Sequence, residues 1–214
     1  MSLEREDVLA LVYDLANQRG VLIPGGVDEQ DVHALASHLR MDIPPDLWAW
    51  LLTCNPPQVT RGRLLGISPH NLSVDIQAYL DRHPSWVEKG WIPIAIDATG
   101  NPFVLATRSS KAAVGTPVLF IDHDTSYDEP EYVAASGLWK FLWFLLQHEQ
   151  QLALLEAHAA DEEKWDEEYE RVAYWPFDEV KVVAIDPDIL SCTDAPMPWE
   201  VADQDTERVS QLPK

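Results

Sequence analysis

The residues best suited to chemistry in this sequence are three consecutive polar side chains, Asp122, His123 and Asp124, which follow an apolar run. An imidazole beside carboxylates can be held in one tautomer, exchange a proton near neutral pH, or share a cation with them. Because neighbouring residues of a strand point to opposite faces, these side chains are not required to converge. The competing interpretation is a polar strand end that leads into the loop 125–130. If the protein were an enzyme, its site would gather Asp97, His123 and Asp124 in a concave pocket.

The other reactive residue types lack the spacing that catalysis or metal binding requires. His33 and His38 lie five residues apart and His148 and His158 ten apart, whereas an HExxH zinc helix places its histidines at i and i+4. Ser68 lies in Gly-Ile-Ser-Pro-His, which differs from the Gly-x-Ser-x-Gly turn that exposes a nucleophilic serine. The sequence therefore predicts no catalytic residue, no metal site and no cofactor, so we expect a protein that is not an enzyme.

Cysteine use and hydropathy indicate the compartment. Cys54 and Cys192 are far apart and have no second cysteine or paired histidine beside them, so both are interpreted as reduced thiols and not as metal ligands. The amino terminus mixes acids into its apolar residues, unlike a signal peptide. The longest apolar run, around 142–146, is too short to cross a bilayer. We expect a soluble cytoplasmic protein.

The charge balance restricts the class of partner. Fifteen basic and 36 acidic side chains give a formal net charge of -21. Such a charge repels nucleic acid and anionic membranes at long range and attracts a basic protein. The alternative interpretation is that the charge only maintains solubility. Both interpretations exclude a dedicated nucleic-acid-binding protein.

The segment 161–170 is the most acidic part of the chain and also carries aromatic residues at helical spacing. Aromatic side chains among carboxylates suit a protein interface with a basic partner. The alternative is that the aromatic pair packs back on the domain. The predicted partner-binding residues are Glu162, Glu163, Trp165, Asp166, Glu167, Glu168 and Tyr169.

Hydrophobic periodicity predicts the elements that position these residues. Apolar residues at i, i+3, i+4 and i+7 predict amino-terminal helices within residues 3–40, and two consecutive prolines begin a third, shorter helix at position 44. A short strand is expected at 63–67 and a helix at 73–82. The predicted sheet consists of an almost wholly apolar strand at 91–96, its antiparallel return at 102–107 and a strand at 116–122. A long helix capped by Ser136 follows, then a strand at 179–185.

The order of these elements resembles the SUKH superfamily, which includes the Smi/Knr cell-wall-assembly regulators. The resemblance covers about residues 43–146. The resemblance rests on three features. The first is a helix that begins at a proline and ends at asparagine. The second is a Trp-Ile-Pro strand with an acidic Gly-Asn turn, and the third is a strand that follows glycine and ends in His-Asp. In this sequence they are Pro44, Leu47 and Asn55, then Trp91, Ile92, Pro93, Asp97, Gly100 and Asn101, and then Gly115, Val118, His123 and Asp124. Two prolines follow Asn55 in place of the glycine typical of the family.

The resemblance implies an α+β fold with a mostly antiparallel sheet flanked by helices. Its bacterial members are commonly immunity proteins, which bind a toxin, often a nuclease, and block it without chemistry. Other members are regulators or scaffolds. We therefore expect a non-catalytic protein-binding domain over residues 1–186, with an acidic helical extension at about 156–172 and a polar, loosely ordered tail at 187–214. The first hypothesis is an immunity protein, the alternative a regulatory scaffold, and the third an enzyme.

Overall fold

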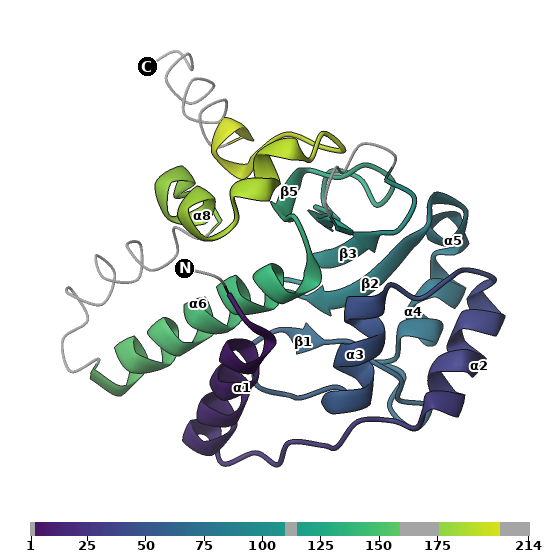
Figure 1. The fold of residues 1–214 in the computed structure, drawn as a ribbon, viewed down its shortest axis with the longest axis horizontal. Helices are drawn as coiled ribbons and strands as arrows, with labels where there is room; N and C mark the ends of the chain where they lie inside the picture. Colours follow the sequence, from purple (N-terminus) through teal and green to yellow (C-terminus); the bar gives the residue numbers. More distant parts are fainter. Residues whose placement is uncertain (1–2, 110–114, 159–175, 202–214) are drawn as a thin grey trace.

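An antiparallel sheet of five strands forms the centre of the part of the chain that the structure describes (Figure 1). The structure is a computed structural model that describes residues 3–109, 115–158 and 176–201, apart from the side chains of residues 157 and 158. The strand order in the sheet equals the order along the chain, so all neighbouring strands are antiparallel. The strands are β1 (Arg63–Leu64), β2 (Trp91–Ile96), β3 (Pro102–Ala106), β4 (Val118–Phe120) and β5 (Tyr132–Ala135).

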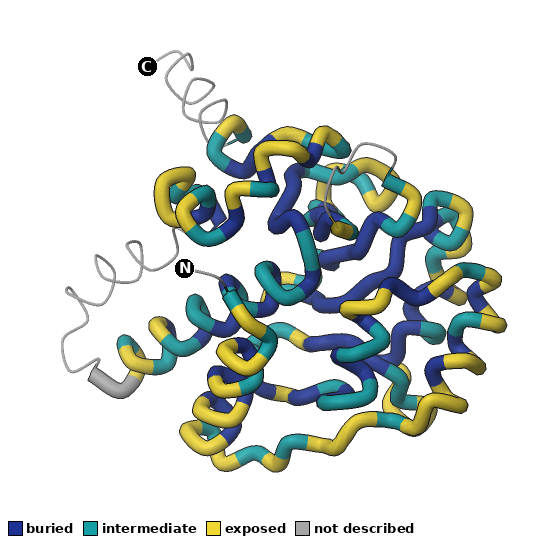
Figure 2. The backbone as a smooth tube through the Cα atoms, in the orientation of Figure 1, coloured by how far each residue is buried: buried dark blue, intermediate teal, exposed yellow. Residues whose placement is uncertain are grey.

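The β2–β3 hairpin is buried on both of its faces. Every residue of both strands is buried (Figure 2). The continuous apolar run at 91–96 fits this burial, because a strand with one solvated face would alternate polar and apolar residues. Pro93, which has no N–H to donate, lies where the β2–β3 register shifts, and that irregularity allows a proline inside the sheet.

Helices cover the sheet, so the expected α+β class is confirmed. On one side α1 and α3 pack on α6, and the ring of Phe103 in β3 lies 4.8 Å from that of Phe141 in α6. The pair α4 and α5 packs on β2, and α2 packs on α3 and α4. None of the described helices is long and apolar enough to span a bilayer. The helices are α1 (Arg5–Arg19), α2 (Glu29–Leu39), α3 (Pro45–Thr53), α4 (Ile76–Arg82), α5 (Pro84–Lys89), α6 (Leu138–His158) and α8 (Glu179–Ile185), with a 3-10 helix η1 (Pro187–Ser191).

Several predicted elements differ from the structure. The segment expected as a strand at 179–185 is the helix α8, because the side chain of Asp178 accepts a hydrogen bond from the Lys181 amide and caps a first helical turn. The helix expected from Ser73 begins at Ile76 and is capped by Asp75. The short helix α5 and the strand β5 had not been predicted. Ser136 does not cap α6 but bonds to Asp186.

The carboxyl-terminal described segment, residues 176–201, closes the free edge of the sheet. The amide of Val133 in β5 donates to the carbonyl of Pro196 at 2.9 Å. The fully buried carboxylate of Asp186 accepts from the Ser136 amide at 2.7 Å and from the Ser136 hydroxyl at 2.6 Å. Lys140 in α6 lies 2.9 Å from Asp186 Oδ1 and 2.8 Å from Asp188 Oδ2. This segment is therefore joined to β5 and to the first turn of α6.

Asp188 and Asp186 together shift the pKa of Lys140. Burial lowers the pKa of Lys140, but hydrogen bonds and charge from Asp188 and Asp186 outweigh it, so that the pKa is raised above its ordinary value. We expect Asp186→Ala to lower the free energy of unfolding by about 3 kcal/mol, because it leaves Lys140 without its buried counter-charge.

Urea unfolding at neutral pH measures that loss. The matched control is Asp188→Ala, which removes the other carboxylate near Lys140. Its side chain is 40% exposed, so the expected cost is below about 1 kcal/mol. Equal losses for the two variants would show that Asp186 has no special role.

Candidate functional site

The turn between β2 and β3 is organised by one carboxylate. Oδ1 of Asp97 accepts hydrogen bonds from the backbone amides of Thr99, Gly100 and Asn101 at 2.9, 2.7 and 2.8 Å. It also accepts the hydroxyl of Thr99 at 2.8 Å. A carboxylate that bonds to successive amides fixes a tight turn, which is the ordinary role of aspartate at such positions. The turn role expected for Asp97 and Asn101 is present.

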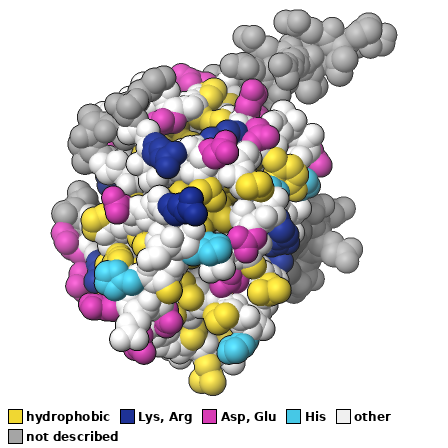
Figure 3. Space-filling model, turned by 90° about the vertical axis from the view of Figure 1, so that its right-hand side faces the viewer, with side chains coloured by type: hydrophobic (Ala, Val, Ile, Leu, Met, Phe, Trp, Pro, Cys, Tyr) yellow, Lys and Arg dark blue, Asp and Glu magenta, His cyan; other side chains and the backbone are white. Residues whose placement is uncertain are grey.

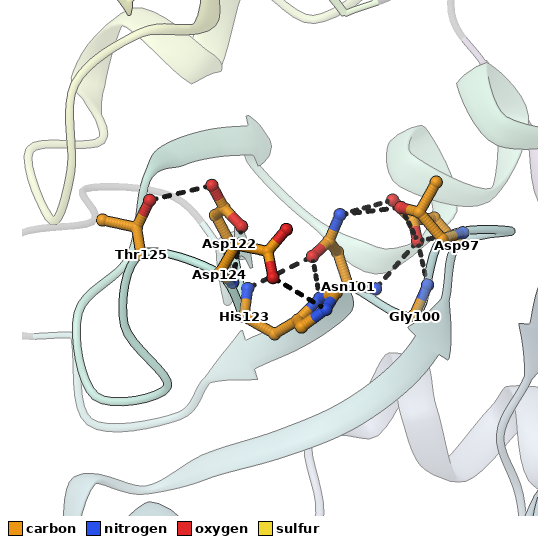
Figure 4. Close-up of polar contacts among 8 residues, drawn as sticks. Asp97, Gly100, Asn101, Asp122, His123, Asp124 and Thr125 are labelled. Atoms are coloured by element: carbon orange, nitrogen blue, oxygen red, sulfur yellow. Dashed lines mark hydrogen bonds and ion pairs between the residues drawn. The ribbon is translucent and has the colours of Figure 1, made fainter.

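Asn101 connects this turn to the end of β4 (Figure 4). Its Nδ2 donates to Asp97 Oδ2 at 3.1 Å, and its Oδ1 accepts the backbone amide of His123 at 3.1 Å. The ring nitrogen Nδ1 of His123 is also bonded to Asn101 Oδ1, and an amide oxygen only accepts, so Nδ1 carries the proton. The other ring nitrogen, Nε2, lies 3.3 Å from Asp124 Oδ1. Asn101 thus joins Asp97 to His123, and His123 in turn pairs with Asp124.

This network stabilises turns, and few of its polar atoms are without a hydrogen-bond partner and able to act on a substrate. Both oxygens of Asp97 are occupied, and the hydroxyl of Thr125 donates to Asp122. The hydrogen bond from the Asp124 amide is the first cause that holds the pKa of Asp122 below its usual value. The side chain of Asp124 is 88% exposed, so the His123–Asp124 pair lies open to solvent. Among the described residues no group of three or more His, Cys, Asp or Glu side chains is placed to hold a metal ion.

The cysteines are poor nucleophiles in this fold. Burial raises the pKa of Cys54 to about 12, and burial together with Asp186 and Asp194 raises that of Cys192 to about 11. A thiol with such a pKa is protonated at neutral pH, and the thiolate is the reactive form. Both residues act as small buried hydrophobic side chains.

A stack of rings adjoins the network, and sequence reasoning missed it. The ring of His83, between α4 and α5, lies 5.0 Å from Tyr79, 4.8 Å from Trp86 and 5.1 Å from Tyr127. Tyr127 in turn lies 6.0 Å from His123. Tyr79, His83 and Trp86 lie at i, i+4 and i+7, a spacing that could have indicated their contact, whereas Tyr127 is more than forty positions away and its contact had no sign in the sequence.

Polar contacts hold the loop 122–131 against α5. The indole N–H of Trp86 donates to the carbonyl of Tyr127 at 2.8 Å. Lys89 donates to the carbonyl of Asp128 at 2.6 Å and lies 2.8 Å from its carboxylate, which Ser85 also contacts at 3.0 Å. The loop is therefore ordered before any partner binds.

The remaining residues of the family resemblance have structural roles. Nδ2 of Asn55 donates to the Ile67 carbonyl, and Oδ1 of Asn55 accepts the Ile67 amide, both at 2.7 Å. A Cβ atom on Gly66 would lie 2.1 Å from that Oδ1, so the close approach requires glycine there. This contact forms even though two prolines follow Asn55. The others lie at the start of α3 (Pro44), inside it (Leu47), in β2 (Trp91, Ile92, Pro93), in the β2–β3 turn (Gly100), before β4 (Gly115) and in β4 (Val118).

The acidic residues predicted to bind a partner lie outside the described residues. These are Glu162, Glu163, Trp165, Asp166, Glu167, Glu168 and Tyr169, and their role stays a prediction.

Replacing Asn101 by aspartate tests the network. We expect Asn101→Asp to destabilise the protein by about 2 kcal/mol at neutral pH, since it puts a second carboxylate beside Asp97 in place of a donor. Two adjacent carboxylates raise the pKa of one of them in the folded state, so the loss shrinks as pH falls through that raised pKa. Urea unfolding at several pH values measures it. Asn71→Asp is the control, because Oδ1 of Asn71 only accepts from Ser73 and a carboxylate can do the same.

The ring stack makes stability depend on pH through His83. Burial first, and then the charge of Arg82, lower the pKa of His83, while Asp128 opposes them. The neutral ring is thus favoured in the folded state, so its contribution is complete above the ordinary histidine pKa and is lost as pH falls below it. We expect His83→Phe to retain the stack and to reduce the loss of stability between about pH 7.5 and about pH 5.5. His70→Phe, at an exposed position, should leave the loss unchanged; the same slope in all three proteins would contradict the assignment.

Comparison with known proteins gives the family. The model of the SMI1/KNR4 family (SUKH-1) matches residues 26–142, more than half of the chain. The matched region contains all five strands, the Asp97–Asn101–His123 network and the loop 122–131. No curated protein shows significant similarity to the chain. On the strength of the family match, the chain belongs to the SMI1/KNR4 family (SUKH-1).

Proposed function

We propose that the protein works by binding another protein, and that it is an immunity protein which neutralises a basic bacterial toxin stoichiometrically. Family membership supports a non-catalytic immunity or regulatory domain. The observation that carries the narrower proposal is the formal charge of -21, which favours a basic partner. A nuclease toxin is one such partner, since a surface that holds phosphates is basic.

The loop 122–131 supplies a described surface of suitable chemistry. The side chain of Asp124 is 88% exposed and that of Asp128 62% exposed, and Glu129 is exposed as well. Tyr127 is 41% exposed between them and can act as an aromatic anchor. Because Trp86 and Lys89 already hold the loop, a partner would not have to order it, which reduces the entropic cost of binding.

The other supported function is a regulatory scaffold that binds a cellular protein without any toxin. Both functions share the same family and the same surface, so the structure favours neither. They differ in the identity of the partner and in whether a toxic activity disappears when the complex forms.

The experiment starts with capture of partners from the host at low salt, followed by reconstitution with the purified partner. We expect a basic protein whose association rate falls about tenfold from low to physiological ionic strength, because opposite charges steer the encounter. A one-to-one amount of the chain should abolish any toxic activity of that partner. The regulatory alternative predicts binding with no activity to abolish.

Charge reversal locates the surface. Asp124→Lys combined with Glu129→Lys should slow association several-fold if the loop 122–131 is the interface. Reversal of Glu162, Glu163, Asp166, Glu167 and Glu168 tests the acidic segment in the same assay. An acidic partner, or an association rate that neither set of changes affects, would refute charge-steered binding.

A further inference from the structure

His123 has an acceptor at each of its two ring nitrogens. Its Nδ1 is bonded to Oδ1 of Asn101, and its Nε2 lies 3.3 Å from Oδ1 of Asp124. An amide oxygen and an ionised carboxylate both accept hydrogen bonds and cannot donate them. A neutral imidazole has one N–H and can serve only one of these oxygens, whereas the imidazolium has two and serves both. The arrangement around His123 therefore suits the doubly protonated ring.

Loss of one proton from the ring changes only one of the two contacts. Oδ1 of Asn101 also accepts the His123 amide at 3.1 Å, and Nδ2 of Asn101 donates to Asp97 Oδ2 at 3.1 Å. These bonds fix the asparagine in one orientation, so the remaining proton stays on Nδ1. The lone pair of a neutral Nε2 then faces the carboxylate of Asp124 and repels it. The side chain of Asp124 is 88% exposed and can turn into solvent. Asp124 is thus paired when His123 is charged and free when His123 is neutral.

The groups around His123 are mostly carboxylates. A proton on the ring and a cation brought by a partner would therefore act on the same negative charge. A proton on His83 would add positive charge in the same sense, from behind the ring of Tyr127. The titratable groups that face His123 are Asp122 and Asp124 of its own segment, Asp97 reached through Asn101 of the β2–β3 turn, Tyr127 at 6.0 Å, and His83, whose ring lies 5.1 Å from that of Tyr127.

We propose that Asp124 is the contact for a lysine or arginine side chain of the partner, and that His123 controls access to it. Neutral His123 leaves the carboxylate of Asp124 to the partner, and protonated His123 keeps it paired within the protein. Histidine side chains change charge between about pH 5 and about pH 8, so binding should weaken as the pH falls through that range. This inference rests on the proposed function, because it requires that the loop 122–131 bind a basic protein.

Linkage gives the sign and the size of the effect. The proton on His123 and the cation of the partner compete for Asp124, so each weakens the binding of the other by the same factor. Because the His123–Asp124 pair lies open to solvent, we expect a factor of about three. The pair adjusts the affinity for a basic partner and does not abolish it.

The first measurement uses the full chain alone. Nitrogen spectra of the histidine rings should show Nδ1 of His123 protonated throughout, with Nε2 gaining its proton between about pH 8 and about pH 5. The ¹³C resonance of the Asp124 carboxylate should follow that transition. It should lose most of the transition in His123→Gln, whose side-chain amide can still donate to Asn101. An Asp124 resonance that is insensitive to protonation of His123 would overturn the proposal.

The second measurement follows binding of a blocked tetra-arginine peptide through the amide shifts of the loop 122–131. We expect affinity at the Asp124 amide to be about threefold lower at about pH 5.5 than at about pH 7.5. The same affinity at both pH values is expected in His123→Gln. Asp124→Asn should lose the pH dependence as well, and it changes an exposed side chain, so it tests the proposal even if His123→Gln does not fold.

A control is required because His123 is not the only histidine near acids. Figure 3 views the side of the molecule that carries α2, α4 and α5, and shows several histidines among acidic side chains. Protonation of these histidines reduces the negative potential of the whole chain. Asp14→Asn removes the same charge as Asp124→Asn from an exposed site on α1 and should retain the pH dependence.

The outcomes separate this inference from the proposed function. Equal affinity of the peptide for the loop at both pH values would overturn control by His123 and leave the proposed function intact. Loop amides that do not shift at either pH would overturn this inference together with the loop as the binding surface. A pH dependence that survives Asp124→Asn would belong to other histidines and would overturn the role of Asp124.

Discussion

Burial of both faces of the β2–β3 hairpin is the constraint on which the rest of the structure depends. All residues of these two strands are buried, so neither face of the hairpin can be left to solvent. The helix α6 covers one side through Phe141 against Phe103, and α4 and α5 pack on β2. The edge strand β5 is closed by the carboxyl-terminal segment, which the family match does not include. Residues beyond the family region therefore complete the core and are more than an appendage.

Local sequence patterns correctly predicted the elements that depend mainly on their own residues. The hairpin was predictable because its apolar run is continuous and its turn carries aspartate, glycine and asparagine. The segment 179–185 was predicted wrongly, because its β-branched residues favour a strand while the Asp178 cap and the burial of Val182 give a helix. Residue types alone do not show which of two local preferences the tertiary contacts will select.

The candidate site shows the same division. The turn role of Asp97 follows from sequence, because the residues that it bonds lie within four positions. The contacts of Asn101 with His123 and of His83 with Tyr127 join residues that are distant in the chain, so no spacing rule could reveal them. No single residue identified the family. The order of the elements along the chain predicted it through a resemblance, and the family match over residues 26–142 confirmed that prediction.

The helix α5 contributes to two different surfaces. Lys89 pairs with Asp128 of the loop 122–131, while Val87 and Glu88 line a groove between α2 and the α4–α5 pair. A surface that carries both signs of charge in a fixed arrangement discriminates among partners better than a uniform one, because a wrong partner meets like charge at one of the two places. A uniformly negative surface would attract basic proteins without discriminating among them.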